Sequence, residues 1–349
     1  MINQRMFDHY GIDTKKDLAI RGARCPRPFD TVLIDKTGSC YACECTAWLP
    51  QSIGNLQIQP LSEIIGNARH QHIQSTIEDG TYRLCNEHQC SYIQAGVFNA
   101  SNWIDQRRQA GRPLVRTIRL AIDDSCNLRC PSCRPSMIFH KEGSAYQRGR
   151  RLADRVNQWL QSYPEPVTVQ IGSDGDPFAS QVYRYFMQNT PHRDTVDYQI
   201  LTNGLLFEEF RTQVPHVISR LTQLGVSMDG ASQRTYEQLR LGGNWHKILA
   251  NLTAIQSLRQ QQEFKFHIHF VVQRDNYHEM MAIIDLAEHY GADKIYLNRI
   301  EDWNVMNKFE QQNIWHTEHY QQCLQQVIKR QQSQSRRFIE CATLLPHLS

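Results

Sequence analysis

Three cysteines within eight residues are the part of this chain best suited to chemistry. Cys126, Cys130 and Cys133 lie in the segment CNLRCPSC, directly after the alternating apolar run 114–122, which predicts a strand. Closely spaced thiolates on one loop are typical ligands of an iron–sulfur cluster, which normally takes four. Because three thiols leave one iron without a protein ligand, a substrate can bind there. The loop therefore predicts a redox enzyme.

A structural zinc site is the main alternative for this loop. Cys130 and Cys133 have the spacing of half a zinc knuckle, but such a site normally needs a second pair. The next histidine, His140, lies seven residues beyond Cys133. An odd number of thiols also argues against a disulfide. The spacing favours a cluster over zinc and over unrelated core cysteines.

A second candidate metal centre lies in the first hundred residues. Its six cysteines are Cys25, Cys40, Cys43, Cys45, Cys85 and Cys90. Six thiols exceed the four that one cluster needs. Four of them would also satisfy a zinc ion in number, so zinc is the alternative here.

Glycines and short polar residues follow several of the predicted strands. They are Gly175, Asp176, Thr202, Asn203, Ser227 and Asp229. Glycine lets the backbone approach a ligand closely, and hydroxyl, amide and carboxylate groups can bind a ribose or an amine. Taken singly, each residue also fits an ordinary turn or a helix cap.

Strands and helices alternate along the rest of the chain. We predict strands at 114–122, 166–172, 196–202, 221–228, 264–273 and 293–299, and helices at 150–162, 178–189, 205–213, 232–259 and 277–290. This alternation predicts βαβ units and a parallel sheet. The cysteine loop follows its strand, and α/β barrels carry their active sites at that end of the strands. A helix at 310–332 and a short strand at 337–344 are expected to end the chain.

Composition narrows the class of protein further. The 349 residues carry a net charge of +3, which is too mild to indicate a nucleic-acid partner. No stretch approaches the ~20 apolar residues of a membrane span, and the N-terminus lacks the apolar core of a signal peptide. We therefore expect a cytoplasmic protein without a membrane partner. Eleven cysteines in that compartment point to metal or redox chemistry rather than to disulfides.

The Cys-x3-Cys-x2-Cys loop after a first strand resembles the signature of the radical S-adenosylmethionine (radical SAM) superfamily. The resemblance implies an α/β fold, a partial (β/α)6 TIM-like barrel, with a 4Fe–4S cluster on the loop and SAM chelated to its open iron. It further implies reductive cleavage of SAM to a 5′-deoxyadenosyl radical, which abstracts hydrogen from a substrate.

The resemblance also implies which residues bind SAM. They are Gly175, Asp176, Pro177, Asn203, Ser227, Asp229, Arg240 and Asn276. Gly175-Asp176-Pro177 stands where the family has Gly-Gly-Glu-Pro, so Asp replaces Glu. Arg240 would place the SAM carboxylate as a bidentate donor, although a Glu237–Arg240 pair on a helix surface is the alternative.

Residues 25–91 resemble the SPASM or shorter twitch domain, which holds an auxiliary cluster in radical SAM enzymes that modify peptides and sugars. This implies a second 4Fe–4S cluster on Cys25, Cys43, Cys85 and Cys90, with Cys40 or Cys45 as substitutes. The domain usually follows the barrel, whereas here it precedes it. We expect an auxiliary-cluster domain at 1–110, a barrel at 111–310, and a helix with a tail at 311–349.

Together the two resemblances predict an oxidoreductase that abstracts hydrogen from a peptide or protein, giving an oxidation or a cross-link. Flavodoxin or ferredoxin is the expected electron donor. Oxidation of a sugar or nucleotide-linked metabolite is the alternative, because no peptide-gripping domain is evident. A non-catalytic iron–sulfur redox sensor is the alternative from another class. The residues at separate strand ends argue against that sensor.

Overall fold

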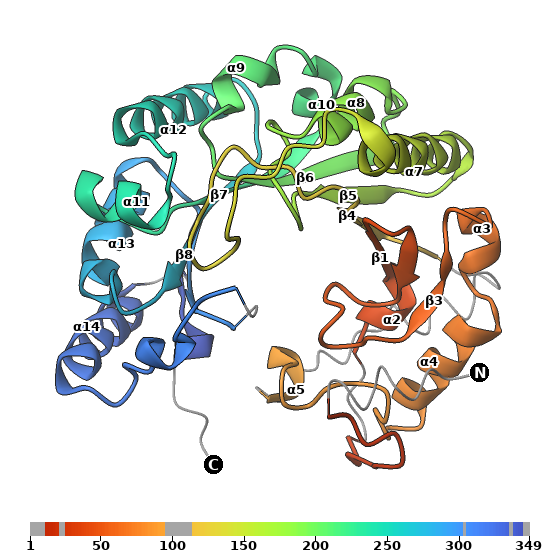
Figure 1. Ribbon diagram of the computed structural model, residues 1–349, viewed down its shortest axis with the longest axis horizontal. Coiled ribbons are helices and arrows are strands. Elements are labelled where there is room, and N and C mark those ends of the chain that lie inside the picture. The colour runs from red at the N-terminus through yellow and green to blue at the C-terminus, as the bar shows by residue number, and fades with distance from the viewer. Residues whose placement is uncertain (1–10, 21–24, 95–113, 303–304, 335–337, 345–349) are drawn as a thin grey trace. The chain divides into compact units, whose positions relative to one another are not determined.

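The computed structural model describes residues 11–20, 25–94, 114–302, 305–334 and 338–344. The chain divides into two compact units (Figure 1). The first comprises Met1–Asp123, His140–Asp174 and Tyr185–Asp197. The second comprises Asp124–Phe139, Gly175–Arg184 and Tyr198–Ser349. The two units are described one at a time.

The first unit is built on a sheet that joins strands from both of its ends in sequence. Strands β1 (Thr31–Asp35) and β4 (Thr117–Ala121) pair in parallel over their whole length. β1 also pairs antiparallel with β2 (Ser39–Tyr41), which pairs with β3 (Ser52–Asn55), and β4 pairs in parallel with β5 (Val167–Ile171). The cysteine-rich segment therefore shares a sheet with the strand that precedes the Cys126 loop.

Helices precede β4 and follow the Cys126 loop in this unit. They are α2 (Arg27–Asp30), α3 (Leu61–Ile64), α4 (Ala68–Glu78), α5 (Ser91–Gln94) and α7 (Gly143–Ser162). α7 is longer at its start than the helix predicted at 150–162. Its added turns carry Arg148, whose Nε donates to the Lys36 carbonyl at 2.7 Å. Two turns further on, Arg155 donates to the Leu56 carbonyl at 2.5 Å. α7 is thus tied to the loops that follow β1 and β3.

The second unit contains parallel strands in the order β6-β7-β8-β9-β10. Their bounds are β6 (Val196–Thr202), β7 (Leu221–Ser227), β8 (Lys265–Val272), β9 (Lys294–Arg299) and β10 (Ile339–Glu340). Val226 and Ile268 are buried on one face of the sheet, and Ser227 and His269 lie on the other because side chains alternate along a strand.

Helix α8 (Gln181–Asn189) precedes β6. The later helices are α9 (Phe207–Arg211), α10 (Pro215–Ser219), α11 (Gln233–Leu239), α12 (Trp245–Arg259), α13 (Met280–His289) and α14 (Glu318–Ser333), with short 3₁₀ turns η1 (Tyr277–Glu279), η2 (Phe309–Gln312) and η3 (Ala342–Leu344). Helices α11 to α14 lie along one side of β7 and β8 (Figure 1). Asn244 caps α12, since its side chain accepts from the Lys247 N–H.

The predicted α/β class is confirmed, with parallel strands alternating with helices as in a partial barrel. All six predicted strands are present within three residues of the expected bounds. The single helix predicted at 232–259 is wrong, because Gly242 and Gly243 separate α11 from α12 and Gly242 has a φ of 92°. The helix predicted at 205–213 ends at Arg211, and the one predicted at 310–332 begins only at Glu318. The strand predicted at 337–344 is reduced to β10 followed by η3.

The predicted domain boundary near residue 110 lies outside the described residues. The division at 1–110, 111–310 and 311–349 stays a prediction, and the two compact units follow a different division. No helix in the described part of the chain has the length and apolarity that a membrane crossing requires.

Candidate active site

The cysteine loop is closed by backbone contacts within the second unit. The Cys126 N–H donates to the Ile138 carbonyl at 2.8 Å, which joins the two ends of the loop. The Cys130 carbonyl accepts from the N–H groups of Cys133 and Arg134 at 2.9 and 3.0 Å, forming a tight turn. Cys126 and Cys130 are buried, whereas Cys133 is exposed. The loop thus presents three thiols from a fixed backbone.

Donor groups surround the sulfur atoms of this loop. The Cys126 Sγ accepts from the Leu128 N–H at 3.4 Å and from the Asn203 side-chain amide at 3.7 Å. The Cys133 Sγ accepts from the Arg134 guanidinium at 3.5 Å. Such donors stabilise thiolates and tune the potential of a cluster that they hold.

Burial dominates the acidity of the two inner thiols. It raises the pKa of Cys130 to about 11, while Arg240 acts in the opposite direction. Burial likewise raises the pKa of Cys126, and the Asp176 carboxylate adds to the increase. Without a bound metal both thiols are therefore protonated at neutral pH, and metal binding must displace their protons.

Asp176 is the hub that joins this loop to the neighbouring strand ends. Its Oδ1 accepts from the backbone N–H groups of Phe178 and Ala179 at 3.0 and 3.1 Å. Its Oδ2 accepts from the Thr202 hydroxyl at 2.7 Å and the Asn203 N–H at 2.8 Å. Four donors satisfy the carboxylate, so a ligand would meet the backbone of this segment rather than the acid. Gly175 has a φ of 69°, which suits such an exposed backbone turn.

Asn203 contacts the cysteine loop directly. Its Nδ2 donates to Asn127 Oδ1 at 2.8 Å, and its Oδ1 accepts from the Leu205 N–H at 3.0 Å. Ser227 lies at the end of β7, half-buried and beside His269 on the next strand. Both positions are those expected of residues that line a ligand site, and their contact with SAM stays a prediction.

The structure gives Asn276 and Arg240 partners that the sequence did not reveal. Asn276 is fully buried, and its Nδ2 donates to the carbonyls of Asp229 and Val271 at 3.0 and 2.9 Å. Arg240 lies 2.8 Å from the Asp229 carboxylate, measured from Nε to Oδ2. The alternative Glu237–Arg240 pair is not formed, because Glu237 accepts from the Trp245 N–H instead.

Five of the six N-terminal cysteines lie near one another in the first unit. Burial raises the pKa of Cys25 to about 12, and the nearby Cys90 thiol adds to the increase. Burial raises the pKa of Cys43 in the same way, with contributions from Cys25 and Cys85. The pKa of Cys90 is also raised by burial, and Cys45 adds to it.

Cys40 lies apart from this group. It is fully buried on β2, and its thiol donates to the Gly38 carbonyl at 3.6 Å. Burial raises the pKa of Cys40 to about 12, and the charge that adds to it among the described residues is that of Asp35, not of another cysteine. The geometry therefore favours Cys45 over Cys40 as a substitute ligand.

Sequence comparison relates the chain to a group of nucleotide-cyclising enzymes. No model of a known protein family matches the chain. It is 24% identical over 180 residues to a probable GTP 3′,8-cyclase of Methanococcus maripaludis strain C5, which is 51% of this chain and 57% of that protein. It is 23% identical over 184 residues to the GTP 3′,8-cyclase of Synechocystis sp., covering 52% of this chain and 54% of that protein. These similarities agree with the resemblance of the cysteine loop to the radical SAM superfamily.

Solved structures of other proteins resemble this chain more distantly. Streptococcus suis SuiB bound to the precursor peptide SuiA has a TM-score of 0.47 and 9% identity, covering 80% of this chain and 64% of that one. The protein anSMEcpe with bound AdoMet has a TM-score of 0.40 and 14% identity, covering 62% and 59%. The chain spans little more than half the length of the curated relatives it matches.

The residues present fit the cofactors of the superfamily, SAM and a 4Fe–4S cluster. The N–H groups that donate hydrogen bonds to the sulfur atoms of Cys126 and Cys133 also suit bound thiolates. The second cluster, on the N-terminal group, stays a prediction.

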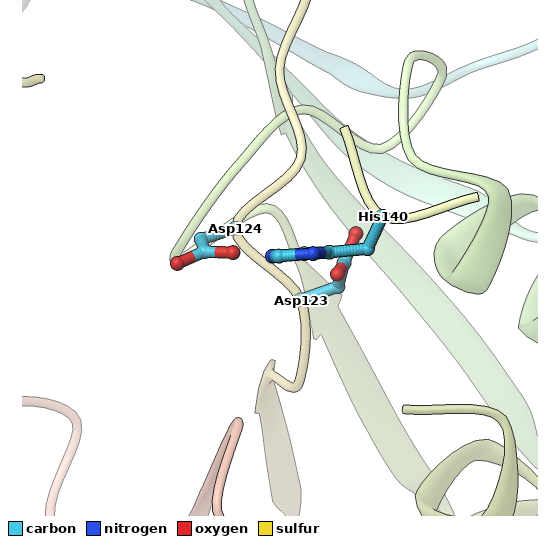
Figure 2. Close-up of side chains that lie close together, drawn as sticks. All are labelled: Asp123, Asp124 and His140. Carbon is cyan, nitrogen blue, oxygen red and sulfur yellow. The ribbon is translucent and has the colours of Figure 1, made fainter. Parts of the chain in front are cut away.

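The structure also brings together a group that sequence reasoning missed. Figure 2 shows Asp123, Asp124 and His140, whose ligand atoms all lie within 4.8 Å of one another. Asp123 is buried and the other two are half-buried. The signal in the sequence was the acidic pair directly after the predicted strand. His140 was considered only as a partner for the cysteines, for which its spacing is wrong.

Proposed function

We propose that the chain is a radical SAM oxidoreductase that abstracts hydrogen from a peptide or protein substrate. The observation that carries the proposal is the convergence of Cys126, Cys130 and Cys133 beside the strand ends that Asp176 ties together. When bound, the cluster would supply the electron that cleaves SAM into methionine and a 5′-deoxyadenosyl radical.

The protein's own residues would position the cofactor and exclude water. Cys126 and Cys130 are buried, which keeps solvent from a reactive centre. The turn at Gly175 offers backbone groups to the SAM amine, while the Asp176 carboxylate holds that turn against Asn203. Arg240 is the cation placed to meet the SAM carboxylate, and Asp229 holds it in position.

The peptide substrate is proposed from the cysteine-rich N-terminal segment. Its sequence resembles the auxiliary-cluster domains of peptide-modifying enzymes, and five of its thiols lie near one another. A closed second cluster would accept an electron from a substrate radical, which makes the net reaction an oxidation.

A nucleotide substrate is the second candidate, and the relatives favour it. The curated proteins that match the chain are named GTP 3′,8-cyclase. The similarity covers about half of each chain, so their substrate is carried over only as a proposal.

Anaerobic reconstitution tests the proposed reaction. The protein is loaded with iron and sulfide, SAM and dithionite are added, and 5′-deoxyadenosine is measured by chromatography. We expect its formation in the native protein and its loss in Cys126→Ala. A fully loaded native protein that leaves SAM intact would refute the proposal.

A second experiment separates the substrate classes. SAM deuterated at the 5′ position does not report on the substrate, so unlabelled SAM is incubated with either deuterated GTP or a deuterated peptide library. Deuterium in 5′-deoxyadenosine identifies the substrate class that loses the hydrogen. Transfer from GTP alone would exclude the peptide proposal.

A further inference from the structure

Arg240 is a charged residue in a place closed to water. Its side chain is 11% exposed and that of Asp229 is 3% exposed. Burial alone would lower the pKa of Arg240, but the Asp229 charge raises it, so the guanidinium stays protonated. A buried ion pair therefore lies directly after α11.

Asp229 is held in place from the side opposite Arg240. Its Oδ1 accepts from the Val271 N–H at 3.0 Å. Asn276 donates to the backbone carbonyls of both Asp229 and Val271, and its own Oδ1 accepts from the Gln273 N–H at 2.8 Å. All the hydrogen-bonding groups of the Asn276 side-chain amide thus form hydrogen bonds with backbone groups. Asn276 positions Asp229 and does not reach beyond it.

Arg240 is held by the break between α11 and α12. Its N–H donates to the Tyr236 carbonyl at 2.8 Å, and its carbonyl accepts from the Gly243 N–H at 2.6 Å. The next residue, Leu241, accepts from the Arg129 N–H of the cysteine loop at 2.9 Å. The backbone that follows Arg240 is therefore bonded to Arg129, the residue before Cys130.

The contact between the two charges leaves donors of Arg240 uncommitted. Its Nε lies 2.8 Å from Asp229 Oδ2, yet the N–H is not directed at that oxygen in hydrogen-bond geometry. The pair is an electrostatic contact rather than a closed bidentate fork. The charge of Arg240 can therefore act electrostatically on groups other than Asp229.

We propose that the Asp229–Arg240 pair sets the reduction potential of the cluster held by Cys126, Cys130 and Cys133, with Arg240 raising it and Asp229 lowering it. This inference rests on the proposed function, because it requires that cluster. One-electron reduction by an external donor adds negative charge to the cluster. A buried cation nearby stabilises the reduced form and a carboxylate destabilises it, since charges interact strongly away from water.

Asp229 also lowers the cost of burying Arg240, because an unpaired buried charge is strongly destabilising.

Redox titration followed by electron paramagnetic resonance tests the inference on the full-length reconstituted protein. The cluster in question is identified as the one whose signal changes when SAM is added. We expect Arg240→Gln to lower its potential and Asp229→Asn to raise it. Asp229→Asn keeps an oxygen that can accept from Val271. Arg234→Gln removes an exposed charge from the same helix and should leave the potential unchanged.

A double variant guards against single variants that fail to hold iron. Asp229→Asn with Arg240→Gln removes both charges and leaves neither unpaired, and its potential should lie between those of the two single variants. Single variants that shift the potential in the same direction, or a double variant whose potential lies outside the range of the two single variants, would overturn the inference. A native protein without iron or without SAM cleavage would refute the proposed function instead.

Discussion

At the scale of single residues, the side chains predicted to touch SAM divide into two kinds. The polar side-chain atoms of Asp176 and Asn276 form hydrogen bonds within the protein and hold the turns around them. Asn203 and Arg240 lie against the cysteine loop or close to its thiols. The sequence singled out these positions but did not reveal this difference, because hydrogen-bond partners depend on contacts between distant segments.

The Asp176 carboxylate should matter for stability even without a cofactor. In Asp176→Asn one acceptor oxygen becomes an NH₂ group that faces N–H or O–H donors, which leaves buried donors unpaired. We expect a loss of about 2 kcal/mol or more in the free energy of unfolding, measured by urea denaturation of the metal-free protein. Asp285→Asn, at an exposed carboxylate, is the matched control. Equal stabilities of the two variants would contradict this role.

His267 should give the protein a pH-dependent stability. Burial lowers its pKa to about 4, with the Lys294 charge adding to the decrease, against an ordinary value of 6.5. The unfolded chain therefore binds this proton more readily than the folded one. The contribution of His267 to stability is complete above about pH 6.5 and is lost as the pH falls towards 4.

Substitution of His267 checks this sign. In His267→Gln the free energy of unfolding should vary less with pH between about 4 and 6.5 than in the native protein. His72→Gln, at an exposed histidine, should leave the native slope unchanged. A native slope that persists in His267→Gln would assign the effect to other groups.

At the scale of elements, the sequence predicted the strands well and the helix ends poorly. Each strand from 114 to 299 has an alternating or continuous apolar pattern that few other structures share. The helix predicted at 232–259 has a helical pattern on both sides of Gly242 and Gly243, so periodicity alone did not reveal the break. That break is what allows Arg240 to leave the helix and meet Asp229.

The turn between β7 and α11 depends on the absence of a side chain at Gly230. A Cβ there would lie 2.3 Å from the Tyr236 backbone nitrogen, a contact that cannot be relieved by a rotamer change. We expect Gly230→Ala to destabilise the protein by about 1–3 kcal/mol, as other overpacked sites do. Gln238→Ala, on the exposed side of α11, should change the free energy of unfolding by less than about 0.5 kcal/mol. Equal urea midpoints for both variants would contradict the close approach.

At the scale of the whole molecule, two groups of cysteines predict two separate clusters. A variant with Cys126, Cys130 and Cys133 all changed to Ala should keep the iron of the N-terminal group. Cys85→Ser should lose iron from that group, whereas Cys40→Ser should not, because Cys40 lies apart from the other thiols. Iron and sulfide quantitation of the three proteins checks this. Complete loss of iron in the triple variant would exclude an N-terminal cluster.

The resemblance to the radical SAM superfamily and the α/β class followed from one motif and one alternation, because each depends on neighbours in sequence. The joining of β1 to β4 could not be predicted, since the strand pairing links residues about 86 positions apart. The division at residue 110 was predicted from nearby glycine and proline residues, which carry no information about strand pairing between the two sides of that boundary.

The parallel pairing of β1 with β4 has a consequence for how the chain can be shortened. A chain that starts at residue 111 would lack β1 and leave the backbone donors and acceptors on one side of β4 unpaired. Open strand edges of this kind recruit other chains and promote aggregation. Size-exclusion chromatography should therefore find the shortened chain in large assemblies. The cysteine-rich segment would then protect solubility as well as hold iron.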